Sequence, residues 1–284
     1  MRGPILISIF LLLTTSCSKN REQKLLFVIA GQSNAMGVGD STKSVYKELP
    51  CFEYNSLKNS FVVLKDPVGQ DDLGFSIAKT GSFIPAFAYK YAELTKREVN
   101  VVQCAKGGSS LSVKAETKDW GNWDRKGKLL QSSFEKIDLA LSAANMKGSL
   151  KNQITAIIWS QGENDGEAIG KGFLTAGEYK MDLKNLISAY RERYGTSLPF
   201  IIIETGRHSN CKECDEGYAV VRQIQQDVAA EDTHTYIGYN ETKDFIERGW
   251  LKDPVHYNQE ALNEIGEKLA KFMVLNKIES NLPR

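Results

Sequence analysis

One serine and one histidine in this 284-residue chain stand where they could form a nucleophile and its base. Ser33 lies in FVIAGQSNAMG, residues 27–37, where an apolar run ends in a polar turn between two glycines. Serine is a poor nucleophile until a base, usually a histidine oriented by a carboxylate, takes its proton. His256 follows Asp253 by three residues in DPVH, so one turn of chain can bring the carboxylate to Nδ1 and leave Nε2 free. Each motif alone is also compatible with an ordinary turn.

Two further motifs could stabilise the oxyanion that forms when a nucleophile attacks an ester. Gly107 and Gly108 in KGGSS have no Cβ, so their backbone N–H groups can approach a substrate closely. The side-chain amides of Gln161 and Asn164 in QGEND are alternative donors. A plain glycine turn and a helix-capping polar loop are the simpler interpretations of these two motifs. Together with the serine and DPVH motifs, they supply each part of a serine hydrolase site.

These motifs need a scaffold that brings distant loops together. Five apolar runs are typical of buried parallel strands, and they lie at Leu25–Gly31, Val99–Ala105, Ile154–Ser160, Phe200–Thr205 and His234–Tyr239. Helical patterns alternate with them, near residues 83–94, 129–146, 176–194, 218–230 and 258–275. This alternation predicts a parallel sheet of about five strands covered by helices. Residues 40–81 are expected to be an irregular insertion with a short strand around Phe61–Leu64.

The predicted sheet explains why the motifs belong together. Ligands of open α/β sheets bind outside the carboxyl ends of the strands. GQSN, KGGSS and QGEND follow the first three predicted strands, and DPVH follows the fifth. We therefore expect the nucleophile, the oxyanion donors and the base to lie along one edge of the sheet.

In this order, GQSN, the glycine pair, QGEND and DPVH resemble the motifs of SGNH (GDSL-type) hydrolases. More narrowly, the chain is similar to the sialic acid-specific acetylesterases and to carbohydrate esterase family six, which includes acetyl xylan esterases. The resemblance extends from about Leu25 to Lys271, and VRQIQ at residues 221–225 also matches this group. It implies a three-layer α/β/α, flavodoxin-like fold in a single domain over residues 25–284. The ordinary α/β-hydrolase fold fits less well, because Ala35 occupies the last position of its Gly-x-Ser-x-Gly elbow.

The resemblance also assigns roles to individual residues. Ser33 corresponds to the nucleophile, His256 to the base and Asp253 to the residue that orients the base. The backbone N–H groups of Ser33 and Gly108 would form part of the oxyanion hole.

The third oxyanion donor has two candidates. Residues 162–165, with the sequence GEND, fit the Gly-x-Asn-Asp block of general SGNH hydrolases, which would select Asn164. The Gln-Gly-Glu sequence that recurs in the carbohydrate esterases favours Gln161 instead. We prefer Gln161 and keep Asn164 as the alternative.

The resemblance implies hydrolysis of acetyl esters on sugars, such as acetylated xylan or sialic acid, through a serine acyl-enzyme and without a metal or organic cofactor. Trp120 and Trp123 in KDWGNWD could stack on a sugar ring, and His208 could touch the substrate. Packing or structural roles are the simpler interpretations of these three residues. Two other functions stay open: a carbohydrate-binding surface lipoprotein on a hydrolase scaffold, and an esterase of peptidoglycan or small lipid esters.

The first residues have the pattern of an export signal. Arg2 precedes the apolar run Ile5–Leu13, which is of signal-peptide length, and TTSC leads into Cys17. This resembles the lipobox of bacterial lipoproteins, in which the cysteine is lipidated. We expect a signal peptide at residues 1–16, a tether at 17–24 and an envelope protein anchored to the membrane only through its lipid. An ordinary secretory signal with an incidental cysteine is the alternative.

Charge and cysteine content narrow the range of partners. Without Arg2, the chain has 35 basic and 35 acidic side chains, so the totals indicate no basic face for nucleic acid. Apart from Cys17, the cysteines are Cys51, Cys104, Cys211 and Cys214. For the CKEC loop we favour a disulfide or free thiols over a zinc site with His208, because zinc would need a fourth ligand. We therefore expect no metal.

Overall fold

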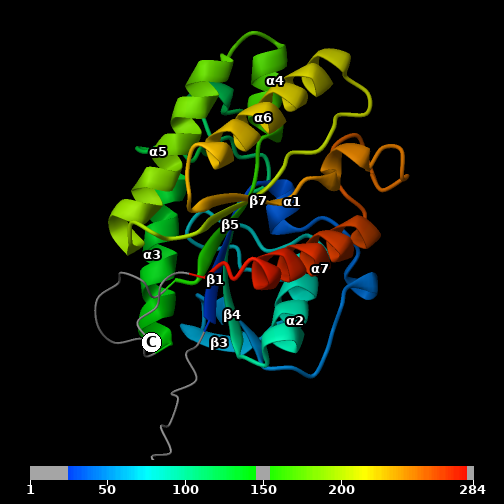
Figure 1. Ribbon diagram of the computed structural model, residues 1–284. Coiled ribbons are helices and arrows are strands. Elements are labelled where there is room, and N and C mark those ends of the chain that lie inside the picture. The colour runs from blue at the N-terminus through cyan, green and yellow to red at the C-terminus, as the bar shows by residue number, and fades with distance from the viewer. Residues whose placement is uncertain (1–24, 145–153, 280–284) are drawn as a thin grey trace, which may run out of the picture.

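The computed structural model describes residues 25–144 and 154–279. Their centre is a seven-stranded sheet with the order β3-β2-β4-β1-β5-β6-β7 (Figure 1). Every neighbouring pair is parallel except the hairpin β2–β3. The strands are β1 Leu25–Gly31, β2 Cys51–Asn55, β3 Ser60–Val63, β4 Val99–Ala105, β5 Ala156–Ser160, β6 Phe200–Ile203 and β7 Thr235–Tyr239.

The five apolar runs of the sequence form five parallel strands of this sheet, β1, β4, β5, β6 and β7, as predicted. All seven residues of β1 and of β4 are buried, because helices cover both faces of these strands. The sheet has two strands more than expected. Both come from the segment predicted to be an irregular insertion, where β3 matches the short strand expected near Phe61 and β2 was not anticipated.

The helices form a layer on each face of the sheet. Leu25, Phe27 and Ile29 of β1 point into a core shared with α2 and α7, whereas Leu26 and Val28 point into a core shared with α3, α5 and α6. Figure 1 shows α2 and α7 on one side of the sheet and α3 and α5 on the other. The helices are α1 Ser33–Met36, α2 Ile84–Thr95, α3 Lys128–Ala143, α4 Glu163–Gly170, α5 Ala176–Tyr194, α6 Lys212–Ala230 and α7 Gln259–Leu275. The result is the expected three-layer α/β/α arrangement.

The carboxyl ends of β1, β4 and β5 are held close together at one edge. The Gln32 N–H donates to the Ser160 carbonyl oxygen at 3.0 Å, and the Lys106 N–H donates to the Gly31 carbonyl oxygen at 3.1 Å. A Cβ on Gly31 would lie 2.0 Å from the Ser160 carbonyl oxygen, so only glycine fits there. The fold thereby brings the loops that follow these strands side by side.

The predicted signal peptide, the tether and Cys17 fall in residues 1–24, outside the described part of the chain. Among the helices of the described ranges, none combines the length and apolar character needed to cross a membrane.

Candidate active site

The loop after β1 presents Ser33 at the start of a very short helix. Gln32 precedes α1 with non-helical backbone angles, and the Met36 N–H closes the turn by donating to the Gln32 carbonyl oxygen at 2.8 Å. Gly37, at φ 108°, ends the helix after four residues. Ser33 is only 8 % exposed, so most of its surface is covered by neighbouring residues. The polar turn of the sequence is therefore a buried helical turn with Ser33 as its first residue.

The DPVH turn faces this hydroxyl across 223 residues of sequence. His256 Nε2 lies 2.9 Å from Ser33 Oγ, and His256 Nδ1 lies 2.7 Å from Asp253 Oδ2. The other carboxylate oxygen, Asp253 Oδ1, accepts the N–H of Val255 at 3.1 Å and of His256 at 2.8 Å. Serine, histidine and aspartate thus form one continuous hydrogen-bonded chain, the arrangement that activates a serine.

The environment of Asp253 keeps its carboxylate charged. Burial opposes ionisation, but hydrogen bonds from the Val255 N–H and from the ring and N–H of His256 outweigh it and lower the pKa of Asp253. A charged carboxylate at Nδ1 holds the proton of a neutral imidazole on that nitrogen. Nε2 is then the nitrogen that can accept the serine proton.

Two backbone N–H groups on the loops that follow β1 and β4 are candidate oxyanion donors, those of Ser33 and Gly108. Neither the Ser33 N–H nor the Gly108 N–H donates to an acceptor within the described ranges. Gly108 has φ 75°, and a Cβ there would lie 1.8 Å from Trp120 Cε3, so the Trp120 indole packs directly on this glycine. An oxyanion hole uses backbone N–H groups that are not already donated within the protein, and these two meet that condition.

The two candidate amides differ in their surroundings. Gln161 is 1 % exposed, and its Nε2 donates to Gln32 Oε1 at 3.1 Å and to Asp165 Oδ2, so both N–H bonds are used. Asn164 is partly exposed, and its Nδ2 donates to the Gly108 carbonyl oxygen at 2.6 Å. Its second contact, to Thr117 Oγ1, is long at 3.5 Å. Asn164 therefore lies beside Gly108 and has one amide hydrogen that makes only a long contact.

Two glutamines that the sequence did not single out for a role support this loop. Gln32 Oε1 receives the Gln161 amide and, at 3.4 Å, the Gly162 N–H. Gln225, within VRQIQ, donates from Nε2 to the Gln161 carbonyl oxygen at 3.0 Å and accepts the Thr205 N–H at 3.1 Å. In the sequence, only the position of Gln32 next to Ser33 indicates that it could belong to the site. For Gln225, the only indication is that VRQIQ resembles a stretch of the esterase family.

The three residues predicted to contact the substrate lie in different surroundings. Trp123 is fully buried, donates from Nε1 to Ser109 Oγ at 3.1 Å and stacks edge-on with Trp159 at 5.2 Å. The prediction that it contacts a sugar is wrong, because its ring has no exposed surface. Trp120 is 39 % exposed and lies beside Gly108, with Lys118 Nζ 5.1 Å from its ring centre.

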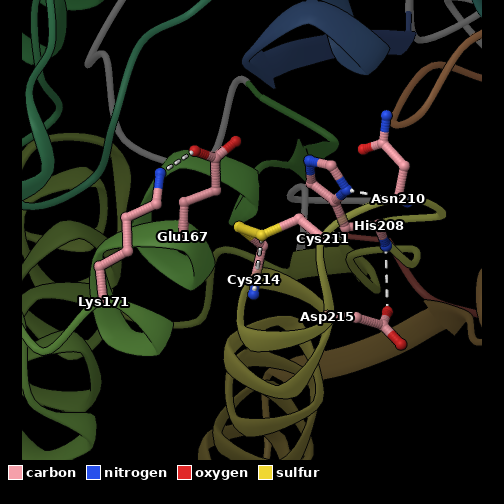
Figure 2. Close-up of a disulfide and its surroundings, with 7 residues drawn as sticks. All are labelled: Glu167, Lys171, His208, Asn210, Cys211, Cys214 and Asp215. Carbon is pink, nitrogen blue, oxygen red and sulfur yellow. Dashed lines mark hydrogen bonds and ion pairs between the residues drawn. A yellow bond between two sulfur atoms is a disulfide. The ribbon is translucent and has the colours of Figure 1, made fainter.

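His208 lies on the loop between β6 and α6, next to a disulfide (Figure 2). Its N–H donates to Asp215 Oδ1 at 3.0 Å, and its ring is 5.8 Å from that of Tyr218. The CKEC motif forms the bridge Cys211–Cys214, which is one of the two forms expected for it, a disulfide or free thiols. Because the Ser209 N–H donates to the Pro254 carbonyl oxygen at 3.0 Å, this loop also supports the DPVH turn.

Solved structures with this fold include two ester hydrolases. A protein from Arabidopsis thaliana has a TM-score of 0.67 at 18 % identity, over 90 % of this chain and 99 % of its own. A carbohydrate acetylesterase from Xanthomonas citri has a TM-score of 0.54 at 15 % identity, over 87 % of this chain and 55 % of its own. A lipase from a goat rumen metagenome has a TM-score of 0.53 at 13 % identity, over 87 % of this chain and 97 % of its own.

The comparison with curated proteins finds no match. The family model named "Carbohydrate esterase, sialic acid-specific acetylesterase" matches residues 23–275, which include every residue of the site described above. The protein therefore has the general role of an esterase, and the chain belongs to the sialic acid-specific acetylesterase family of carbohydrate esterases.

Proposed function

We propose that this protein removes acetyl groups from carbohydrates through a serine acyl-enzyme. The observation that carries the proposal is the unbroken chain of contacts from Ser33 Oγ to His256 and on to Asp253, at 2.9 and 2.7 Å. The N–H groups of Ser33 and Gly108 have no acceptor among the described residues, and membership of a carbohydrate esterase family supports the substrate class.

The reaction follows from these positions. His256 Nε2 takes the proton of Ser33 Oγ as the oxygen attacks the acetyl carbonyl carbon. The oxyanion of the tetrahedral intermediate accepts hydrogen bonds from the N–H groups of Ser33 and Gly108. His256 then gives its proton to the departing sugar hydroxyl, which leaves an acetyl ester on Ser33. A water molecule repeats the sequence and releases acetate.

We assign the third oxyanion donor to Asn164 and not to Gln161, the residue preferred from the sequence. The two hydrogens of Gln161 Nε2 are donated to Gln32 and Asp165, and redirecting one would leave a buried acceptor without its partner. Asn164 Nδ2 already binds the Gly108 carbonyl oxygen, and its other hydrogen has only the long contact to Thr117. We therefore assign this second hydrogen of Asn164 to the oxyanion.

Substrate specificity is tested by acetate release from a panel. Acetylated xylan, O-acetylated sialic acid, acetylated peptidoglycan, aryl acetates and long-chain aryl esters are compared at equal ester concentration. We expect the acetyl esters to be cleaved and the long-chain esters to be poor substrates, with at least one acetylated glycan giving the highest kcat/KM. Glycan binding without any acetate release would instead favour the carbohydrate-binding protein, and preference for long chains would favour a lipid esterase.

We also propose that Trp120 forms a wall for the sugar. Its indole is partly exposed and packs on Gly108, whose N–H is one of the proposed oxyanion donors. Trp120→Ala is expected to raise KM for the preferred glycan about tenfold, equivalent to about 1.4 kcal/mol, and to leave kcat on an aryl acetate unchanged. Trp120→Phe keeps a flat ring and serves as the control. An unchanged KM for the glycan in Trp120→Ala would rule out this contact.

The location of the enzyme is proposed from the N-terminal segment. The apolar run after Arg2 and the small residues before Cys17 support an exported lipoprotein of a bacterial envelope, whose partner is the acetylated glycan. Cys17→Ala, produced from the full gene, is expected to move the protein from the membrane fraction to the soluble fraction. A wild-type protein already found in the soluble fraction would contradict the lipid anchor.

A further inference from the structure

The side chain of Asn34, the residue after the nucleophile, contacts both neighbours of the base. Its Nδ2 donates to the Val255 carbonyl oxygen at 3.2 Å, and its Oδ1 accepts the Tyr257 N–H at 3.4 Å. Val255 and Tyr257 are the residues on either side of His256. One buried amide, 1 % exposed, therefore holds the backbone before and after the base.

A third contact fixes which way this amide faces. Asn34 Nδ2 also donates to Glu163 Oε1 at 2.7 Å, where Glu163 begins α4 after β5. In the opposite orientation the amide oxygen would face two acceptors, and the amide nitrogen would face the Tyr257 N–H. Because Glu163 is 4 % exposed, water cannot readily relieve such a mismatch. Glu163 thereby fixes Asn34 in the orientation that binds both neighbours of His256.

This arrangement links the loop of the nucleophile to the backbone of the base. Asn34 is covalently linked to Ser33, so its side chain transmits the position of α1 to the 255–257 backbone. The only direct contact between the two reacting side chains is Ser33 Oγ to His256 Nε2, and proton transfer depends on keeping it near its 2.9 Å. The Asn34 hydrogen bonds do not involve the reacting atoms, whereas the serine–histidine contact must break in every turnover.

We propose that Asn34 is a positioning residue for the esterase reaction, holding the backbone of His256 at the distance at which Nε2 can take the Ser33 proton, with Glu163 orienting its amide. This inference rests on the proposed function. Asn34 acts through His256 and does not touch the substrate. Its loss therefore slows acylation without weakening ester binding.

The test compares Asn34→Ala with Asn100→Ala. Asn100 is also a buried asparagine that donates to a glutamate, to Glu98 Oε1 at 2.9 Å, but it lies near the start of β4, away from the carboxyl ends of the strands. Both variants are expected to lose thermal stability. Asn34→Ala alone is expected to lose about 10- to 100-fold in kcat on an aryl acetate with KM changed less than about twofold. Equal kcat in Asn34→Ala and wild type would overturn the proposal.

A second readout separates this proposal from the proposed function. An organophosphorus ester that phosphorylates activated serines reports the Ser33–His256 pair without any acetyl group. We expect its inactivation rate to fall in Asn34→Ala by about the same factor as kcat. If the wild type neither reacts with this probe nor releases acetate, the proposed function fails. If the wild type does both and Asn34→Ala matches it, only the positioning role fails.

Three further variants guard against loss of the fold and isolate the part played by Glu163. If Asn34→Ala does not fold, Asn34→Asp keeps the side-chain shape and the acceptor for Tyr257 but removes the donor, and the same fall in kcat is expected. Glu163→Gln keeps an acceptor for Asn34, whereas Glu163→Ala has none. Recovery of most of the kcat in Glu163→Gln relative to Glu163→Ala supports the orienting role, and equal loss in both contradicts it.

Discussion

Replacing Ser33 with alanine is expected to lower kcat for aryl acetate hydrolysis by about 10⁴- to 10⁶-fold, because the variant has no oxygen to form the acyl-enzyme. The fold should survive, since the only hydrogen bond of the Ser33 side chain is the one to His256 Nε2 among the residues described. The backbone N–H of residue 33 also remains in place. Steady-state acetate release measures the loss, and the thermal midpoint checks the fold.

Ser209→Ala is the matched control for this experiment. Ser209 is an exposed serine close to the DPVH turn, and its contact with Pro254 uses its backbone N–H, which alanine retains. We expect wild-type activity from this variant. Acetate release by Ser33→Ala within tenfold of the wild type would mean that another group is the nucleophile, or that water attacks the ester directly.

Much of this site could be predicted from the sequence, because its main parts can be recognised from short stretches of residues. A buried parallel strand is a continuous apolar run, and the chain must leave its carboxyl end in a loop. Ser33, Gly108 and Gln161 each follow such a run within a few residues, so their gathering at one edge follows from the topology alone. Asp253 and His256 are three residues apart, so a single turn brings them into contact.

The features that the sequence could not decide depend on packing between distant segments. Trp120 and Trp123 share one short motif, yet Trp123 fills the core beside Trp159 and Trp120 lies against Gly108. The same holds for the strand β2, whose mixed CFEYN sequence becomes a strand by pairing with β4 on one side and β3 on the other. No local pattern distinguishes these outcomes.

The roles of the side-chain amides around the nucleophile also depend on distant segments and could not be decided from the sequence. Gln161 and Asn164 are equally able to donate, and the choice between them depends on which acceptors already surround each one. Asn34 lies next to the nucleophile in the sequence, yet its hydrogen-bond partners lie 129 to 223 residues further along the chain, where no local pattern could indicate them. Hydrogen-bond partners can be assigned only when the fold is known, whereas residue types and their spacing can be read from the sequence alone.

Replacing Asp253 with asparagine is expected to lower kcat by about 10⁴-fold, because the histidine would hold its proton on the wrong nitrogen. Oδ1 of the new side chain can still accept the N–H groups of Val255 and His256, which preserves the turn. At the position of Oδ2, however, an NH₂ group would face His256 Nδ1 and require that nitrogen to accept. The neutral ring must then carry its proton on Nε2, where it can no longer take the proton of Ser33.

Comparison with Asp253→Ala separates this tautomer effect from loss of the turn. Alanine removes both the acceptor for the two N–H groups and the partner of Nδ1, so it is expected to lower the thermal midpoint as well as kcat. Asparagine should keep the midpoint near that of the wild type and lose activity nonetheless. If Asp253→Asn retained kcat within tenfold, orientation of the imidazole by the turn would be sufficient, and the carboxylate charge and its effect on the tautomer would be dispensable.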